Sequence, residues 1–170
     1  FVYFCKAVPY AAAALELRPD IVHAHDWGSG LLPALLRFTA IPPQMQNVKT
    51  VFTIHNLQYQ GRWNPWDVLN WTGLPADLIH PDGLEFYGDA NLLKAGVVYS
   101  DAVTTVSPAY AQEITTLEYG EKLEGVLRRT QQEGRLHGIL NGLDMDRWNP
   151  QTDPYAPFEG LEGKARVKQE

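Results

Sequence analysis

Two histidines, a carboxylate and an indole fall within five residues of the sequence, in the stretch His23-Ala24-His25-Asp26-Trp27. Imidazole and carboxylate groups can ligate a metal ion, move protons or hydrogen-bond a polar ligand. A second polar pair, His55-Asn56, follows the apolar segment KTVFTI. These two stretches are the first candidates for a functional site.

A metal site is one interpretation of the first stretch. His23 and His25 are two residues apart, so on a strand they share a face, and Asp26 and His55 are possible further ligands. The alternative is that strand histidines pack and are hydrogen-bonded, and neither a cysteine cluster nor an HExxH pattern adds weight to the metal. We therefore expect histidines that pack in the sheet and no metal.

Two glycines flank Ser29 directly after this stretch, between an expected strand and an expected helix. Backbone N–H groups at such a place can cradle a phosphate, or the glycines can simply let the chain turn. Because neither GxGxxG nor GxxxxGK[ST] is complete, the turn is favoured. The turn is also the default interpretation of Asn141-Gly142.

A hydroxylated ligand suits the pair His55-Asn56, which supplies neutral donors and acceptors, although a hydrogen-bonded histidine at a strand end is an equal alternative. Trp63, Trp66 and Trp71 could stack on sugar rings, but we expect them to form the small core of a long loop. The residues alone therefore lead to a cleft for a polar ligand.

The elements that position these residues alternate along the chain. The hydrophobic pattern predicts strands over 21–25, 49–55, 102–106 and 135–140, and helices over 7–17, 31–38, 89–100, 109–115 and 119–133. The segment from 56 to about 82 reads as a long loop with short helical turns. Alternating strands and helices imply an α/β fold, with a parallel sheet covered on both faces.

Ligands of such sheets bind outside the carboxyl ends of the strands. The polar residues sit at these ends: His25-Asp26-Trp27 after the first strand, His55-Asn56 after the second, Ser107 after the third and Asn141 after the fourth. Ser107 also precedes Pro108, the pattern of a helix N-cap followed by proline at the first helical position. We expect the four strand ends to line one cleft.

The overall composition excludes several classes of protein. The 170 residues are 45% hydrophobic and 20% charged, which is typical of a soluble globular domain, and the net charge of −6 argues against a nucleic-acid or anionic membrane partner. The single cysteine, Cys5, is expected to pack, and no apolar run is long enough to span a membrane. Because the chain starts at Phe1, without a signal-peptide pattern, and stops in what reads as an opening helix, we expect a piece of a longer protein.

Four long motifs together resemble the bacterial glycogen synthases and plant starch synthases. They are HAHDWGSGLLPALL, TVFTIHNLQYQGRW, GLEFYGDANLLKAGVVYSDAVTTVSPAYAQEI and LHGILNGLDMDRWNP, and they occur in that family's order and approximate spacing from about Phe4 onward. The resemblance implies a Rossmann-like sheet from the N-terminal domain of the two-domain glycosyltransferase B architecture. It divides the chain into the later part of that domain (1–148), a linker (149–163) and the start of the C-terminal domain (164–170).

The family transfers glucose from ADP-glucose to the non-reducing end of an α-1,4-glucan with retention of configuration, without a metal or other cofactor. By resemblance, His55 contacts the transferred glucose near its 6-hydroxyl and Asn56 sits beside it, while Asp26 and Trp27 line the cleft where donor and acceptor meet. Asn141 matches the asparagine of the NG[VI]D signature on the sugar side. Physical chemistry fits these roles, because a carboxylate such as Asp26 and fixed dipoles can stabilise an oxocarbenium-like transition state.

The sequence departs from the family at Gly28, where many members carry histidine, and it lacks the KxGGL loop and the C-terminal domain with its basic residues for the diphosphate. We therefore expect the 170 residues to be inactive alone, with the C-terminal domain as their partner. A bacterial cytoplasm is the expected location, or a plastid for a plant or alga. A related UDP-glucose-dependent transferase and a non-catalytic glucan-binding module remain alternatives.

Overall fold

The computed structural model describes residues 1–153 together with residues 163, 165 and 168. The chain divides into two units, Phe1–Leu140 and Asn141–Glu170. The first unit holds every strand and helix whose packing is described below. This division falls before the boundary predicted at 148, and most of the predicted segments 149–163 and 164–170 lie outside the described residues, so those two assignments stay predictions.

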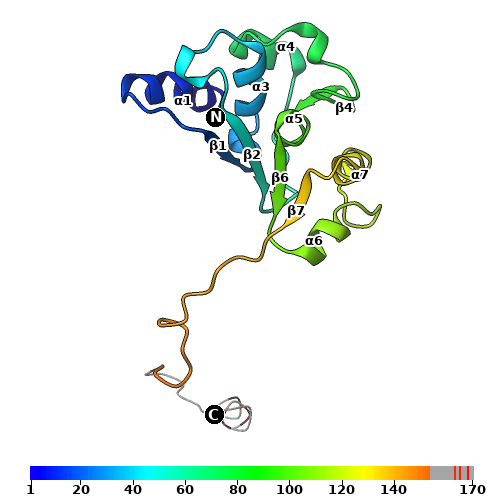
Figure 1. The fold of residues 1–170 in the computed structure, drawn as a ribbon. Coiled ribbons are helices and arrows are strands. Elements are labelled where there is room, and N and C mark those ends of the chain that lie inside the picture. Colours follow the sequence, from blue (N-terminus) through cyan, green and yellow to red (C-terminus); the bar gives the residue numbers. More distant parts are fainter. Residues whose placement is uncertain (154–162, 164, 166–167, 169–170) are drawn as a thin grey trace. The chain divides into compact units, whose positions relative to one another are not determined.

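A four-stranded parallel sheet forms the centre of the first unit. Its strands are β1 (Ile21–His25), β2 (Lys49–Ile54), β6 (Ala102–Thr105) and β7 (Leu136–Gly138), and they lie side by side in the order β1-β2-β6-β7 (Figure 1). All three pairings are parallel, which confirms the predicted sheet and brings the four carboxyl ends to the same edge. The strands are short and rich in valine, isoleucine and threonine, which are β-branched residues that favour strands.

Helices connect and cover these strands. The longer ones are α1 (Val2–Ala14), α3 (Leu32–Phe38), α4 (Pro65–Thr72), α5 (Leu92–Tyr99), α6 (Pro108–Glu113) and α7 (Glu124–Gln132), and a single turn, α2 (Asp26–Ser29), follows β1 directly. Two 3₁₀ turns complete the set, η1 (Pro43–Met45) and η2 (Ala76–Leu78). Local signals place several boundaries: Ser107 Oγ accepts a hydrogen bond from the amide of Tyr110, which confirms the predicted N-cap of α6.

The core lies on one face of the sheet. Phe52, Ile54 and Val103 point to this face and are fully buried against Leu93 of α5 and Leu127 of α7, among other apolar side chains. A second apolar cluster joins α1, α2, α3, α4 and α5 and includes Cys5, which is 1% exposed as predicted. The helices that carry these clusters hold the strand ends in place.

On the opposite face of the sheet, β1 departs from the prediction of a sheet covered on both faces. The odd-numbered side chains of β1, Ile21, His23 and His25, are exposed in the part of the chain that the structure describes. The physical reason is visible in IVHAH itself, where histidines alternate with Val22 and Ala24. That period of two is the pattern of a strand with one buried face, and not of a strand buried on both faces. His23 and His25 are hydrogen-bonded, as predicted, but their side chains are exposed and not covered, so that part of the prediction is wrong.

A second, smaller sheet replaces part of the predicted loop and of one predicted helix. β3 (Arg62–Trp63), β4 (Glu85–Phe86) and β5 (Asp89–Asn91) pair antiparallel in the order β3-β5-β4. β5 occupies the first three residues of the helix predicted over 89–100, and Asn91 then caps α5 through a hydrogen bond from the amide of Lys94. The predicted helix exists, but it begins three residues later than predicted. The turn at Tyr87-Gly88, where both residues have positive φ, instead folds the preceding residues into the β4–β5 hairpin.

Three other predicted boundaries shift. α1 covers residues 2–14 instead of 7–17 and contains Pro9, and β7 covers 136–138 instead of 135–140. α7 starts at Glu124 instead of 119, because Glu121 and Lys122 adopt left-handed conformations that end the preceding turn. Its predicted stop is confirmed, since Gly134 has φ of 70° just beyond the helix.

Candidate functional site

Asp26 sits at the point where β1 ends and α2 begins, in a conformation that few residues adopt. Its φ is +53°, in the left-handed region, which aspartate tolerates better than most residues other than glycine. From this position its Oδ1 accepts a hydrogen bond of 2.8 Å from the backbone N–H of His55. The carboxylate therefore joins the ends of β1 and β2 and satisfies a donor that follows the last residue of β2.

The side chains of His25 and His55 meet at the same place. Nδ1 of His25 and Nε2 of His55 are 3.0 Å apart, a hydrogen-bond distance, and the ring centroids are 5.3 Å apart with an interplanar angle of 27°. The strand register pairs His25 with Thr53, so His55 lies just past the end of β2 on the same face. Both histidines are exposed, and a ligand at this edge can reach them.

Burial, followed by the charges of His23 and His55, lowers the pKa of His25, and the opposing effect of Asp26 is smaller. A lowered pKa keeps the His25 ring neutral near pH 7. A hydrogen bond between two histidine rings needs an N–H donor on one ring and an unprotonated nitrogen on the other, so at least one ring must be neutral. The site therefore holds the Asp26 carboxylate beside the neutral imidazole of His25.

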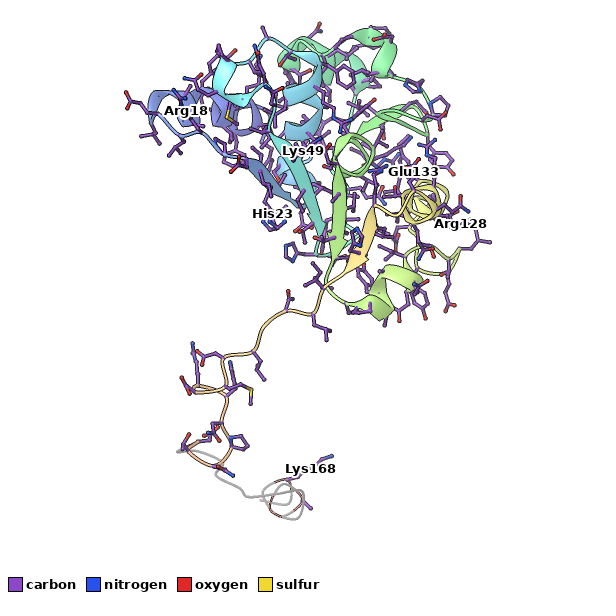
Figure 2. The ribbon with its side chains drawn as sticks, viewed as in Figure 1. Arg18, His23, Lys49, Arg128, Glu133 and Lys168 are labelled. Atoms are coloured by element: carbon purple, nitrogen blue, oxygen red, sulfur yellow. The ribbon has the colours of Figure 1, made fainter. Side chains whose placement is uncertain are left out.

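A row of polar side chains continues along the same face of the sheet. Nε2 of His23 lies 2.6 Å from Oγ1 of Thr53, and that oxygen lies 2.6 Å from Oγ1 of Thr104 on β6. Figure 2 labels His23 on this side of β1 and Lys49 near the beginning of β2. Sequence reasoning missed the two threonines, because their contact depends on the register that pairs Thr53 of β2 with Thr104 of β6.

The other predicted site residues are placed as follows. Asn56 is exposed, and its Oδ1 accepts a hydrogen bond from the amide of Gln58, so this oxygen supports the turn after β2. Trp27 is half-buried between Phe1 and Trp63, at centroid distances of 4.4 and 5.6 Å. Gly61, at φ +62°, lies against the Trp27 ring, where a Cβ would collide with it. Trp27 therefore packs as well as lying next to Asp26.

Ser107 and Asn141 complete the predicted set. The hydroxyl of Ser107 is engaged as the cap of α6. Asn141 is exposed and opens the second unit, so its predicted place beside the other strand ends stays a prediction.

The phosphate-loop interpretation of residues 28–30 gains no support from the geometry. Oγ of Ser29 accepts a hydrogen bond from the amide of His25 and donates one to the carbonyl of the same residue, both at 2.6 Å, so it closes the turn of α2. A Cβ on Gly30 would collide with the carbonyl oxygen of Leu92, because α2 crosses α5 in close contact here. The glycine is needed for packing, which agrees with the predicted turn.

Within the described part of the chain, no group of three or more histidine, cysteine, aspartate or glutamate side chains is arranged to hold a metal ion. In the same residues, no helix is long and apolar enough to cross a membrane. The chemistry available at this edge is hydrogen bonding and electrostatic stabilisation by His25, Asp26 and His55. Such groups suit a polyhydroxylated ligand that develops positive charge.

The three tryptophans of the long loop do not form its core, so that prediction is wrong. Trp63, Trp66 and Trp71 are 39%, 68% and 48% exposed. The segment is instead anchored by aliphatic side chains buried beneath α4 and η2, namely Val68, Leu69, Leu74 and Leu78. The indoles stay available at the surface because the branched aliphatic side chains fill the interior.

Comparison with known proteins decides the family. The family model of the starch synthase catalytic domain matches residues 1–129. The chain belongs to the starch synthase catalytic domain family. This confirms the resemblance carried by the four motifs.

Individual relatives of the family agree. The glycogen synthase of Deinococcus radiodurans is 53% identical over 97% of this chain, and that of Myxococcus xanthus is 49% identical over 100% of it. The solved catalytic domain of starch synthase IV from Arabidopsis thaliana, bound to ADP and acarbose, has a TM-score of 0.79 and 35% identity over 91% of this chain. The predicted Rossmann-like α/β fold, part of a glycosyltransferase B architecture, is confirmed.

The chain spans only part of each of these proteins. It covers 36% of the length of both glycogen synthases and 31% of the Arabidopsis structure.

Proposed function

We propose that the protein to which this chain belongs is a retaining glucosyltransferase, which transfers glucose from ADP-glucose to the non-reducing end of an α-1,4-glucan. The observation that carries the proposal is the match of residues 1–129 to the starch synthase catalytic domain, with the charged and imidazole groups of that segment gathered at one edge of its sheet. The Arabidopsis relative bound to ADP supports the choice of nucleotide. A bacterial cytoplasm is the proposed location, in line with the bacterial relatives.

Each residue of the site has a proposed role. His55 contacts the transferred glucose, and Asn56 hydrogen-bonds the sugar beside it. Asp26 supplies negative charge as the bond from glucose C1 to the nucleotide breaks and the ring acquires oxocarbenium character. Trp27 lies beside Asp26 on the sugar side of the site, and Asn141 keeps the sugar-binding role that the family resemblance implies. No metal or other cofactor is part of the proposal, and the C-terminal domain of the same protein provides the groups that bind the diphosphate.

The full-length protein tests this function directly. Glucose incorporation into glycogen is measured with radiolabelled ADP-glucose and with UDP-glucose at equal concentrations. We expect transfer from ADP-glucose, and its loss by about 10²-fold or more in His55→Ala, because positioning and electrostatic groups each contribute rate factors of that order. His80→Ala is the matched control, since His80 is an exposed histidine in the turn after η2 and outside the carboxyl edge of the sheet.

Preferential use of UDP-glucose would replace the proposal with its closest alternative, a related nucleotide-sugar transferase. Absence of transfer from both donors, in a folded full-length protein, would reject the glucosyltransferase.

The exposed indoles favour one second candidate, a glucan-binding surface. Trp63 and Trp71 line a small cavity of about 230 Å³ together with Phe1 and Tyr3. Aromatic faces bind the apolar faces of sugar rings. If the chain is a non-catalytic glucan-binding module, Trp63→Ala abolishes retention on immobilised soluble glucan and His55→Ala leaves it intact. Equal losses in both variants, or no retention of the parent chain, would reject this candidate.

A further inference from the structure

His25 contacts His55, the residue assigned to the sugar, but has no role in the proposed function. The two side chains are joined by the 3.0 Å contact from His25 Nδ1 to His55 Nε2, with the two rings inclined to each other by 27°. Resting on the proposed function, we propose that His25 is a positioning residue, which fixes the tautomer and orientation of the His55 ring for contact with the substrate.

The backbone holds His25 firmly enough for this task. The residue ends β1 in register with Thr53, and its amide and carbonyl are both hydrogen-bonded to Oγ of Ser29. On its other side the ring packs against His23, with centroids 4.1 Å apart, and His23 is itself bonded to Thr53. His25 therefore sits between two imidazole rings, one anchored to the sheet and one at the open edge.

Two consecutive residues of the chain hold His55 in two different ways. Asp26 holds its backbone through the 2.8 Å hydrogen bond to the amide, and His25 holds its ring. An exposed histidine ring without a hydrogen-bond partner rotates freely about its side-chain torsions, whereas a ring that is hydrogen-bonded through Nε2 is restricted. Within the described residues no second partner is recorded for the His55 ring, so Nδ1 is the nitrogen it presents to a ligand.

The titratable groups that face His25 are His23, His55 and Asp26. Protonation of both members of the His25–His55 pair would place two N–H donors and two positive charges against each other, which breaks the contact. The pair is therefore intact only when at least one ring is neutral.

The experiment compares two substitutions of His25. His25→Phe keeps an aromatic ring against His23 but has no nitrogen, and His25→Asn places an amide group near the position of Nδ1. Long-range ¹H–¹⁵N NMR of the ¹⁵N-histidine-labelled 170-residue chain, at a pH where the imidazoles are neutral, reports the tautomer of His55. We expect one dominant tautomer in the parent chain. We expect a shift of about fivefold in the tautomer ratio in His25→Phe, the factor for one neutral hydrogen bond, and substantial recovery in His25→Asn.

A second measurement uses the full-length protein with ADP-glucose and glycogen. Positioning predicts that His25→Phe lowers kcat by about tenfold or more with a smaller change in KM, and that His25→Asn recovers most of kcat. An unchanged tautomer ratio in a folded His25→Phe chain overturns the proposal, as does an unchanged kcat. If His25→Phe fails to fold, His25→Leu, which also lacks a side-chain nitrogen, takes its place: a changed tautomer ratio supports the proposal, and a parent-like ratio overturns it.

The proposed glucosyltransferase function and the positioning role of His25 can fail separately. If the parent full-length protein transfers no glucose, the proposed function fails, and the NMR result still decides whether His25 sets the tautomer of His55. If the parent transfers glucose and His25→Phe behaves as the parent in either measurement, only the positioning role fails.

Discussion

Substitution of Asp26 tests how the end of β1 is built. The residue combines a left-handed backbone with a hydrogen bond from its carboxylate to the amide of His55. Three substitutions separate these properties. Asp26→Asn keeps an acceptor oxygen and tolerates the conformation, Asp26→Gly keeps only the conformation, and Asp26→Ala keeps neither.

The geometry gives the expected magnitudes. Loss of the hydrogen bond to a charged acceptor costs about 1.5 kcal/mol at this partly exposed site. A Cβ without local hydrogen bonding in the left-handed region costs roughly 1 kcal/mol more, so Asp26→Ala is destabilised by about 2–3 kcal/mol. In Asp26→Gly the strain disappears, but the unfolded chain gains freedom that offsets about 0.4–1 kcal/mol of this gain, so the variant is more stable than Asp26→Ala by up to about 0.6 kcal/mol. Asp26→Asn stays within about 1 kcal/mol of the parent.

Urea unfolding of the chain, followed by tryptophan fluorescence, measures these free energies of unfolding, and equal m-values make them comparable. The expected order of stability is parent, Asn, Gly, Ala. If Asp26→Ala were as stable as the parent, the hydrogen bond to His55 would not contribute. If Asp26→Gly were less stable than Asp26→Ala, the left-handed conformation would not be a feature of the folded state.

Three further results are expected. Gly30→Ala forces a Cβ into the carbonyl oxygen of Leu92, so urea unfolding should show a destabilisation of about 1–3 kcal/mol. The matched control Gly125→Ala lies in open space on α7 and should be neutral or stabilised by up to about 1 kcal/mol. Equal effects of the two substitutions would contradict the close crossing of α2 and α5. Burial raises the pKa of the Cys5 thiol to about 11, so its alkylation by iodoacetamide at pH 8 should occur only as fast as the chain opens, and labelling at the rate of a free thiol would refute this burial. Burial raises the pKa of Asp101, but the hydrogen bonds from Thr50 and the two nearby cations outweigh burial and lower this pKa below its ordinary value. The ionised Asp101 therefore stabilises the fold above about pH 4, and this stabilisation is lost as the pH falls through the folded pKa. Asp101→Asn should therefore be less stable than the parent at pH 7 and lose less stability on acidification, and parallel pH profiles of the two proteins would count against the interaction.

Several features of the fold were predictable because they depend on short segments. The strands IVHAH and KTVFTI, the Ser107-Pro108 start of α6 and the stop at Gly134 all follow from local sequence signals. The parallel sheet followed from the alternation of strands and helices. The family followed from the motifs, since four long strings in order carry more information than any one spacing.

Other features required contacts between distant segments. The small sheet β3-β5-β4 pairs residues 62–63 with 90–91, and no local pattern in either segment indicates the pairing. The exposure of the three indoles likewise depended on which apolar side chains filled the space under α4.

For the site, the sequence by itself determined the chemical groups: His25, Asp26 and His55 stand at strand ends, and parallel pairing brings those ends to one edge. Only the tertiary structure decided how the groups act on one another. The carboxylate of Asp26 holds the backbone of His55, and the ring of His25 holds the ring of His55, across 29 and 30 residues of sequence. The physical reason is that hydrogen bonds depend on distance and angle within a few tenths of an ångström, and these are set by strand register and by the left-handed turn at Asp26.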